Sequence, residues 1–161
     1  MAGIVLMAGT GRTGREILAF QMGYAIERDT SLTAAARAAR MARVPGTVDS
    51  VASASVWMGF FVAHDPLATA RVVKTPVLIL QGADDQQVIA READLLETAF
   101  KAARNRDVTK RVFPELNHLF IRQPGGNPAG YATLRTNLVE PGVLGAVADW
   151  IVARTSTAVR R

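Results

Sequence analysis

The stretch PVLILQGADDQQV, residues 76–88, joins an apolar run to a short polar turn. Its first part, Pro76 to Gln81, carries a continuous Val-Leu-Ile-Leu run, which is typical of a strand buried on both faces of a parallel sheet. Gly82 permits a sharp turn where this strand ends, and Asp84 and Asp85 follow in the turn. Because open parallel sheets carry their sites at the carboxyl ends of the strands, these carboxylates are candidate functional groups.

The rest of the chain alternates apolar runs with helical periodicity. The runs Ile4 to Ala8 and Val108 to Phe113 predict two further strands, of which the second is more polar and suits an edge. Apolar residues recur at helical spacing in residues 89–103 and 140–154, and Pro141 suits a first helical position. Strands that alternate with helices predict an α/β fold, with a short parallel sheet flanked by helices.

The segment between the first two expected strands, residues 15–75, is much longer than a crossover requires. Residues 15–43 are rich in Ala and Arg and look helical. We expect Pro45 and Gly46 to break that helix before a second apolar stretch, Val56 to Ala63. We therefore interpret residues 15–75 as a helical cap-like insertion.

The length, charge and composition of the chain favour a single globular domain and argue against several classes of partner and location. The chain suits a single α/β domain, residues 1–161, that buries a core of its own. The net charge is +5, but the basic residues are scattered without interleaved aromatic residues, so we expect no nucleic-acid partner. No apolar run approaches the ~20 residues of a membrane span. The first residues carry no basic leader and the chain has no cysteine, so we expect no secretion signal and no disulfide, with the cytoplasm as the default compartment.

A histidine follows the third expected strand. His118 lies in VFPELNHLF, 33 residues after Asp85. One helix and one strand fill this interval, so adjacent parallel strands would bring the two loops side by side. A carboxylate bonded to the imidazole Nδ1–H fixes the tautomer and leaves Nε2 free to take a proton from a nucleophile. The alternative is structural: Asp85 caps the following helix and His118 is an ordinary loop histidine.

These residues also carry a family resemblance. The motif G-x-x-D-x-x-V, here Gly82 to Val88, resembles the acid loop of α/β-hydrolases, in particular dienelactone hydrolases and prolyl-oligopeptidase-like esterases. NRDVTKRVFPELNHLF is similar to the run up to that family's catalytic histidine. HDPLATARVVKTPVLILQG and VLMAGTGRTGREILAFQ resemble the approaches to its acid-bearing strand and its helical cap, and the final helix with Trp150 also fits.

The resemblance implies a partial α/β-hydrolase fold and an esterase or lipase-like activity on a small-molecule carboxylic ester, with no cofactor. It also implies that Asp85 is the catalytic acid and His118 the catalytic base. The family's nucleophile is a serine in a G-x-S-x-G elbow. None of the five serines has that pattern, so the sequence looks like the carboxyl-terminal half of a hydrolase.

Three hypotheses about the nucleophile stay open. A separate segment supplies the serine, or Ser50, Ser53 or Ser55 is recruited from the expected cap, or the chain is an inert truncated hydrolase or interaction module. The first expected strand favours a partner, because Ile4, Val5 and Leu6 would lie at an open sheet edge. We therefore expect a homo-oligomer or an amino-terminal partner segment at that edge.

A glycine motif offers a further alternative. GTGRTG, Gly9 to Gly14, matches the G-x-G-x-x-G of dinucleotide-binding turns. That mechanism needs a second strand that ends in an acid about 20 residues further on. Glu27 and Asp29 lie near this distance but in a helix-like stretch, so we favour a steric role for the glycines. His64 has no evident companion ligands, and we expect no metal site.

Overall fold

The computed structural model describes residues 3–158. The chain divides into two compact units. Of the described residues, 3–11 and 67–158 belong to the sheet unit, and Arg12–Pro66 form the helical unit. Residues 67–75, which the sequence assigns to the insertion, are grouped with the sheet unit.

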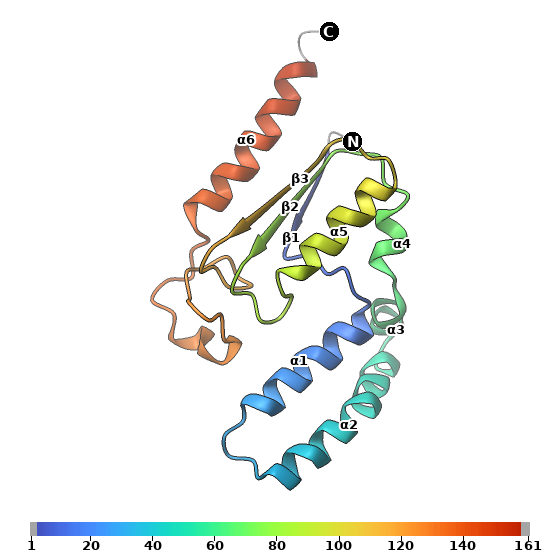
Figure 1. Cartoon of the computed structure of the whole chain (residues 1–161), viewed down its shortest axis with the longest axis vertical. Helices are drawn as coiled ribbons and strands as arrows, with labels where there is room; N and C mark the ends of the chain where they lie inside the picture. Colours follow the sequence, from blue (N-terminus) through green and yellow to red (C-terminus); the bar gives the residue numbers. More distant parts are fainter. Residues whose placement is uncertain (1–2, 159–161) are drawn as a thin grey trace. The chain divides into compact units, whose positions relative to one another are not determined.

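The sheet unit contains three parallel strands in the order β1-β2-β3 (Figure 1). They are β1 (Ile4–Met7), β2 (Val77–Gly82) and β3 (Val108–Phe113). Every residue of the central strand β2 is buried, as its continuous apolar run predicts, whereas β3 lies at an edge and carries exposed residues. The α/β fold class and the parallel sheet predicted from the sequence are therefore confirmed.

Helices cover both faces of this sheet. They are α5 (Arg91–Ala102) after β2 and α6 (Pro141–Ala158) after β3, and the short α4 (Pro66–Ala70) precedes β2. Alternate side chains of β2 point to opposite faces: Leu78 and Leu80 pack in one cluster with Trp150 of α6. Val77 and Ile79 pack in the other cluster with residues of α5. Burial of each apolar side chain of this size stabilises the fold by about 1.5–3 kcal/mol. The strand β2 is therefore held firmly between the two clusters, and so is its carboxyl end.

The helical unit contains α1 (Gly14–Arg28), α2 (Ala34–Ser53) and α3 (Val56–Ala63). Each begins at an N-cap residue whose side-chain hydroxyl oxygen accepts a backbone N–H from the first turn of the helix. These N-cap residues are Thr13, Thr33 and Ser55. A small apolar cluster centred on Val44, Val48 and Val62 holds the three helices together. The predicted helix 15–43 is thus two helices, separated by a turn in which Asp29 accepts hydrogen bonds from Ser31.

The prediction that Pro45 and Gly46 break the helix is wrong. Helix α2 continues through both residues to Ser53. An interior proline removes one hydrogen bond and costs about 3 kcal/mol. Val44 and Val48 are buried on either side of Pro45, and their packing offsets this cost.

Within the described residues 3–158, none of the helices has the length and apolar character that crossing a bilayer would require.

Candidate active site

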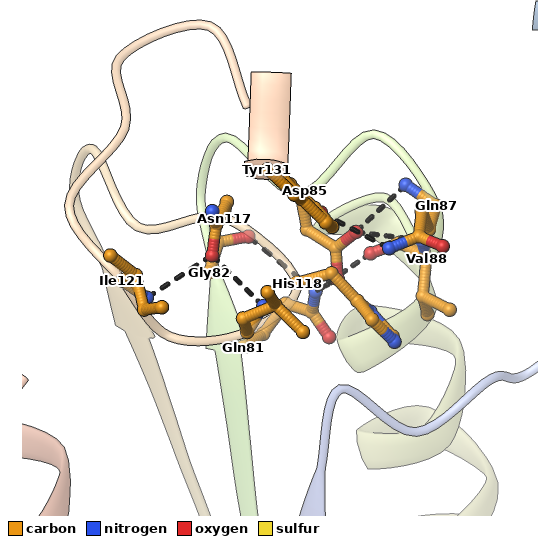
Figure 2. Close-up of polar contacts among 10 residues, drawn as sticks. Gln81, Gly82, Asp85, Gln87, Val88, Asn117, His118, Ile121 and Tyr131 are labelled. Atoms are coloured by element: carbon orange, nitrogen blue, oxygen red, sulfur yellow. Dashed lines mark hydrogen bonds and ion pairs between the residues drawn. The ribbon is translucent and has the colours of Figure 1, made fainter. Parts of the chain in front are cut away.

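A carboxylate and an imidazole meet at the carboxyl edge of the sheet. Asp85 lies in the acid loop (residues 83–88) after β2, and His118 lies in the histidine loop (residues 114–121) after β3. Asp85 Oδ2 is 2.9 Å from His118 Nδ1 (Figure 2). The Asp85 side chain is fully buried, whereas the His118 side chain keeps 30% of its surface exposed. The adjacent parallel strands thus bring these two residues together.

The acid loop supplies further donors to the Asp85 carboxylate. Oδ1 accepts the backbone N–H groups of Gln87 and Val88, each at 2.8 Å. Oδ2 accepts the Gln81 amide Nε2–H at 2.9 Å, in addition to its contact with His118. Three of the four contacts come from N–H donors, so both carboxylate oxygens act as acceptors. The imidazole tautomer that suits this acceptor carries its hydrogen on Nδ1, and Figure 2 shows the second ring nitrogen of His118 directed away from Asp85.

Asp85 does not cap the helix that follows it. Helix α5 has Ala90 at its N-cap position, with no side-chain hydrogen bond there. The two backbone N–H groups that Asp85 accepts belong to its own loop. These bonds shape the acid loop and leave the second carboxylate oxygen for the imidazole.

The histidine loop is built around Asn117, which sequence reasoning did not single out. Asn117 is fully buried. Its Oδ1 accepts the N–H groups of Leu119 and Ile121 at 2.9 and 3.1 Å, and its Nδ2 donates to Gln123 Oε1 at 2.8 Å. Its place directly before His118 was the only signal in the sequence. These hydrogen bonds fix the backbone around His118, and so they fix the position of the Cα atom from which the imidazole extends.

Asp84 ties the acid loop to the turn beyond the histidine loop. Its N–H donates to Leu116 O at 3.0 Å, and its Oδ2 accepts Gly125 N–H at 2.7 Å. Gly126 has φ +54°, and a Cβ there would lie 1.5 Å from Asp84 O. Only glycine fits this approach, so the two loops and the turn are locked to each other.

A groove lies beside the histidine loop. It has a volume of about 410 Å³. Its lining residues are Leu119, Ile121, Tyr131, Ala132, Leu134, Arg135, Thr136 and Asn137. Gln87 of the acid loop donates its side-chain amide to the Tyr131 hydroxyl at 3.1 Å, which connects the groove wall to the loop of Asp85. One wall of the groove is therefore hydrogen-bonded to the acid loop, and Leu119 of its lining follows His118 directly in the chain.

The three candidate serines have local roles in the helical unit. Ser50 and Ser53 donate their hydroxyls to the carbonyls of Gly46 and Asp49, four residues earlier in α2, each at 3.0 Å. Ser55 accepts Met58 N–H at 3.1 Å as the N-cap of α3. All three are exposed, and none lies in a strand-to-helix turn of the kind that activates a serine.

The glycine motif is explained by close packing. A Cβ at Gly11 would lie 2.9 Å from Leu95 Cβ, and one at Gly14 would lie 2.3 Å from Phe61 O. Gly11 N–H donates to the buried carboxylate of Glu92 at 2.9 Å. Helix α1 is followed by α2 rather than by the strand that dinucleotide binding requires.

Glu27 and Asp29, the acids that could bind the ribose of a dinucleotide, do not follow a strand. Glu27 lies within α1. Asp29 follows α1, and its hydrogen bond with the Ser31 side chain lowers the pKa of its carboxyl below the usual 3.8. Asp29 also pairs with Arg40 at 3.3 Å. His64 ends α3 and stacks on Phe60 with ring centroids 5.2 Å apart. Among residues 3–158, no group of three or more His, Asp or Glu side chains is arranged to hold a metal.

Comparison with known proteins places this arrangement in a family. The model of the dienelactone hydrolase family matches residues 35–139. Searches of curated proteins and of solved structures found no match. The matched region contains β2, the acid loop, β3 and the histidine loop. The chain therefore belongs to the dienelactone hydrolase family, part of the α/β-hydrolase superfamily, and is of the α/β-hydrolase type.

Proposed function

We propose that the chain takes part in the hydrolysis of carboxylic esters, with His118 as general base and Asp85 as the residue that orients it. The observation that carries the proposal is the 2.9 Å contact between buried Asp85 Oδ2 and His118 Nδ1. In this arrangement Nε2 takes a proton, and the carboxylate stabilises the imidazolium that forms.

The proposed reaction follows from that geometry. A hydroxyl attacks the ester carbonyl while its proton passes to His118 Nε2. The tetrahedral intermediate then expels the alcohol, which takes the proton back from the imidazolium. If the attacking hydroxyl belongs to a serine, a water molecule repeats the sequence on the acyl intermediate and regenerates the serine.

For the nucleophile, we favour a serine that another polypeptide segment supplies. Ser50 and Ser53 donate their hydroxyls to helix carbonyls, and Ser55 caps α3, so each must leave a hydrogen bond to act. Recruitment of one of them is our second proposal. The role of residues 15–75 as a cap also remains a proposal.

The groove beside the histidine loop is the proposed site for the ester substrate. Leu119, Ile121 and Leu134 give it apolar surface for an acyl chain or an apolar alcohol. The Tyr131 hydroxyl, which accepts a hydrogen bond from Gln87, adds a polar group within reach of the acid loop. Small apolar esters are therefore the first substrates to test.

Hydrolysis of p-nitrophenyl acetate and butyrate tests the proposal. The variant His118→Ala is compared with the unsubstituted chain and with His64→Ala, since these are the two histidines of the sequence. We expect His118→Ala to lose about 10²-fold or more in kcat/KM, because general base catalysis contributes factors of this size, and His64→Ala to keep its rate. Equal rates for all three proteins would remove His118 from any mechanism.

Labelling with a fluorophosphonate addresses the nucleophile. Peptide mapping of the labelled protein, alone and with candidate partner segments, identifies which serine reacts. Label on Ser50, Ser53 or Ser55 supports recruitment. Label on a partner supports the shared-site proposal, and label lost in His118→Ala ties the reactive serine to the imidazole.

An interaction role is a second candidate function. Strand β1 pairs with β2 along one side, and Ile4, Val5 and Leu6 remain only partly buried. Among the described residues, its other side pairs with no strand. A strand edge of this kind is a template for another strand, from a second copy or from a partner segment.

A further inference from the structure

Gln81 is a polar residue in the most buried strand of the sheet. It lies next to the end of β2 and its side chain is fully buried. Its Nε2 donates to Asp85 Oδ2 at 2.9 Å and to Val88 O at 2.7 Å (Figure 2). The oxygen that Gln81 contacts on Asp85 is the same one that contacts His118.

The orientation of the Gln81 amide follows from its neighbours. Val88 O is a carbonyl oxygen and Asp85 Oδ2 is a carboxylate oxygen that already faces other donors, and both accept hydrogen bonds here. A flipped amide would place Gln81 Oε1 against two acceptors and lose both bonds, so the nitrogen must face the carboxylate. Gln81 is therefore a fixed donor to Asp85.

The two carboxylate oxygens of Asp85 are held in different ways. Backbone N–H groups of Gln87 and Val88 hold Oδ1. Gln81 donates to Oδ2, so a turn of the carboxylate about its Cβ–Cγ bond would break hydrogen bonds to both oxygens. We propose that Gln81 is a positioning residue that sets the carboxylate plane so that Oδ2 faces His118 Nδ1. The role of the pair in catalysis rests on the proposed function, whereas the positioning itself does not.

The second atom of the amide argues against a purely structural role. No donor within the described residues reaches Gln81 Oε1, although it is buried. A leucine would fill the same space without a buried acceptor, so packing alone does not favour glutamine here. The amide nitrogen, which donates to Asp85 and Val88, is therefore the atom that accounts for a glutamine at this position.

The variant Gln81→Leu tests the inference, with Gln87→Leu as the matched control. Both remove a glutamine amide close to Asp85, one at the end of β2 and one within the acid loop, but the Gln87 side-chain amide donates to Tyr131. The readout is the downfield ¹H resonance of a hydrogen-bonded imidazole Nδ1–H at low temperature, assigned to His118 by its loss in His118→Ala. This measurement requires no hydrolytic activity.

We expect Gln81→Leu to broaden this resonance beyond detection or move it upfield, and Gln87→Leu to leave it in place. An unchanged resonance in folded Gln81→Leu would overturn the inference. The melting temperature of Gln81→Leu should fall, because the variant leaves Val88 O and Asp85 Oδ2 without the amide donor, and a variant that stays folded at the temperature of the measurement is required. Gln81→Met, an unbranched replacement, takes the place of leucine if that variant does not fold.

Kinetics give a second readout if the ester assay is positive. We expect Gln81→Leu to lower kcat about tenfold and to leave KM within about twofold, because buried Gln81 acts through Asp85 rather than on substrate. A raised KM with unchanged kcat would contradict positioning. If the unsubstituted chain hydrolyses no ester, the proposed function fails, and the Nδ1–H resonance still decides the role of Gln81.

Discussion

Gly82 and Leu116 approach each other so closely that a Cβ on Gly82 would lie 2.3 Å from the Leu116 carbonyl oxygen. Gly82 ends β2 just before the acid loop, and Leu116 belongs to the histidine loop. The same Leu116 oxygen accepts Asp84 N–H at 3.0 Å. The lack of a side chain at Gly82 is therefore what lets the loops of Asp85 and His118 come together.

Replacing this glycine should separate the two loops. We expect Gly82→Ala to lower the free energy of unfolding by about 2–4 kcal/mol, because backbone rather than a flexible side chain must move. Urea unfolding measures the change. Gly145→Ala in α6, where a Cβ meets nothing within 4 Å, is the control and should raise stability by about 0.5–1 kcal/mol. Equal stabilities for Gly82→Ala and the unsubstituted chain would contradict this account of the loop contact.

Asp85→Asn should impair the proposed ester hydrolysis, although the asparagine side chain fills the same space as the aspartate. An asparagine amide nitrogen at the Oδ2 position faces the Gln81 amide and reverses the polarity of the contact with His118. We expect kcat to fall by about 10²–10⁴-fold, since the imidazole would take the wrong tautomer. Asp84→Asn is the matched control because Asp84 contacts Gly125 rather than His118. Similar kcat values for the two variants would argue against a specific role for Asp85.

Asn117→Ala should loosen the histidine loop. The substitution leaves the part-buried N–H of Leu119 and the buried N–H of Ile121 without their acceptor. We expect a loss of about 2–4 kcal/mol in the free energy of unfolding. Asn127→Ala, which removes a single exposed cap on Ala129, should cost about 1 kcal/mol or less. Chemical denaturation of both variants would show whether the buried network matters more.

The ion pairs between α5 and β3 predict that the free energy of unfolding depends on pH. Hydrogen bonds from Lys101 first and Lys110 second lower the pKa of Glu97 below its usual 4.5. Glu97 therefore stabilises the fold fully above pH 4.5, and this contribution is lost as the pH falls through its lowered value in the folded state. Hydrogen bonds with Asp94 first and Glu97 second raise the pKa of Lys110 above 10.5, so its contribution is lost only at more alkaline pH.

Glu97→Gln checks the acid side of this dependence. We expect it to cost about 0.5–1 kcal/mol near pH 7, the size of a partly exposed ion pair. The difference from the unsubstituted chain should shrink towards zero as the pH falls through the lowered pKa of native Glu97. Glu27→Gln, on the exposed surface of α1, should show no such trend. A pH-independent cost at position 97 would mean that the ion pairs do not contribute.

The edge of β1 predicts association. Analytical ultracentrifugation at increasing concentration should show a homo-oligomer, because an open strand edge binds further strands. Met7→Lys places a charge at the exposed end of β1 and should shift the protein towards monomer. Leu144→Lys, on an exposed part of α6, should not. A well-dispersed monomer at high concentration would count against association through this edge.

Local sequence patterns were sufficient for the sheet and for the loops that carry Asp85 and His118. A continuous apolar run predicts a buried strand whatever surrounds it, and the carboxyl-end rule then places the polar residues that follow. The contact between Asp85 and His118 depends on the order of the strands, which the single intervening helix made foreseeable.

Other features depend on contacts between distant residues. Nothing near Pro45 in the sequence indicates that Val62 packs against Val44 and Val48, and this packing keeps α2 intact. Gln81 likewise appears in the sequence as the polar end of an apolar run. Its role emerges only when the acid loop folds back over it and places Val88 O and Asp85 Oδ2 around one nitrogen.

The lock between Asp84 and the glycine turn has an evolutionary consequence. Positions 84 and 125 are 41 residues apart, yet the carboxylate of one needs the N–H of the other. The next residue, Gly126, has no room for a methyl group against the Asp84 carbonyl. Among homologues, positions 84, 125 and 126 should therefore change together. A homologue in which only one of them has changed should have a different conformation in the acid loop and in the turn after the histidine loop.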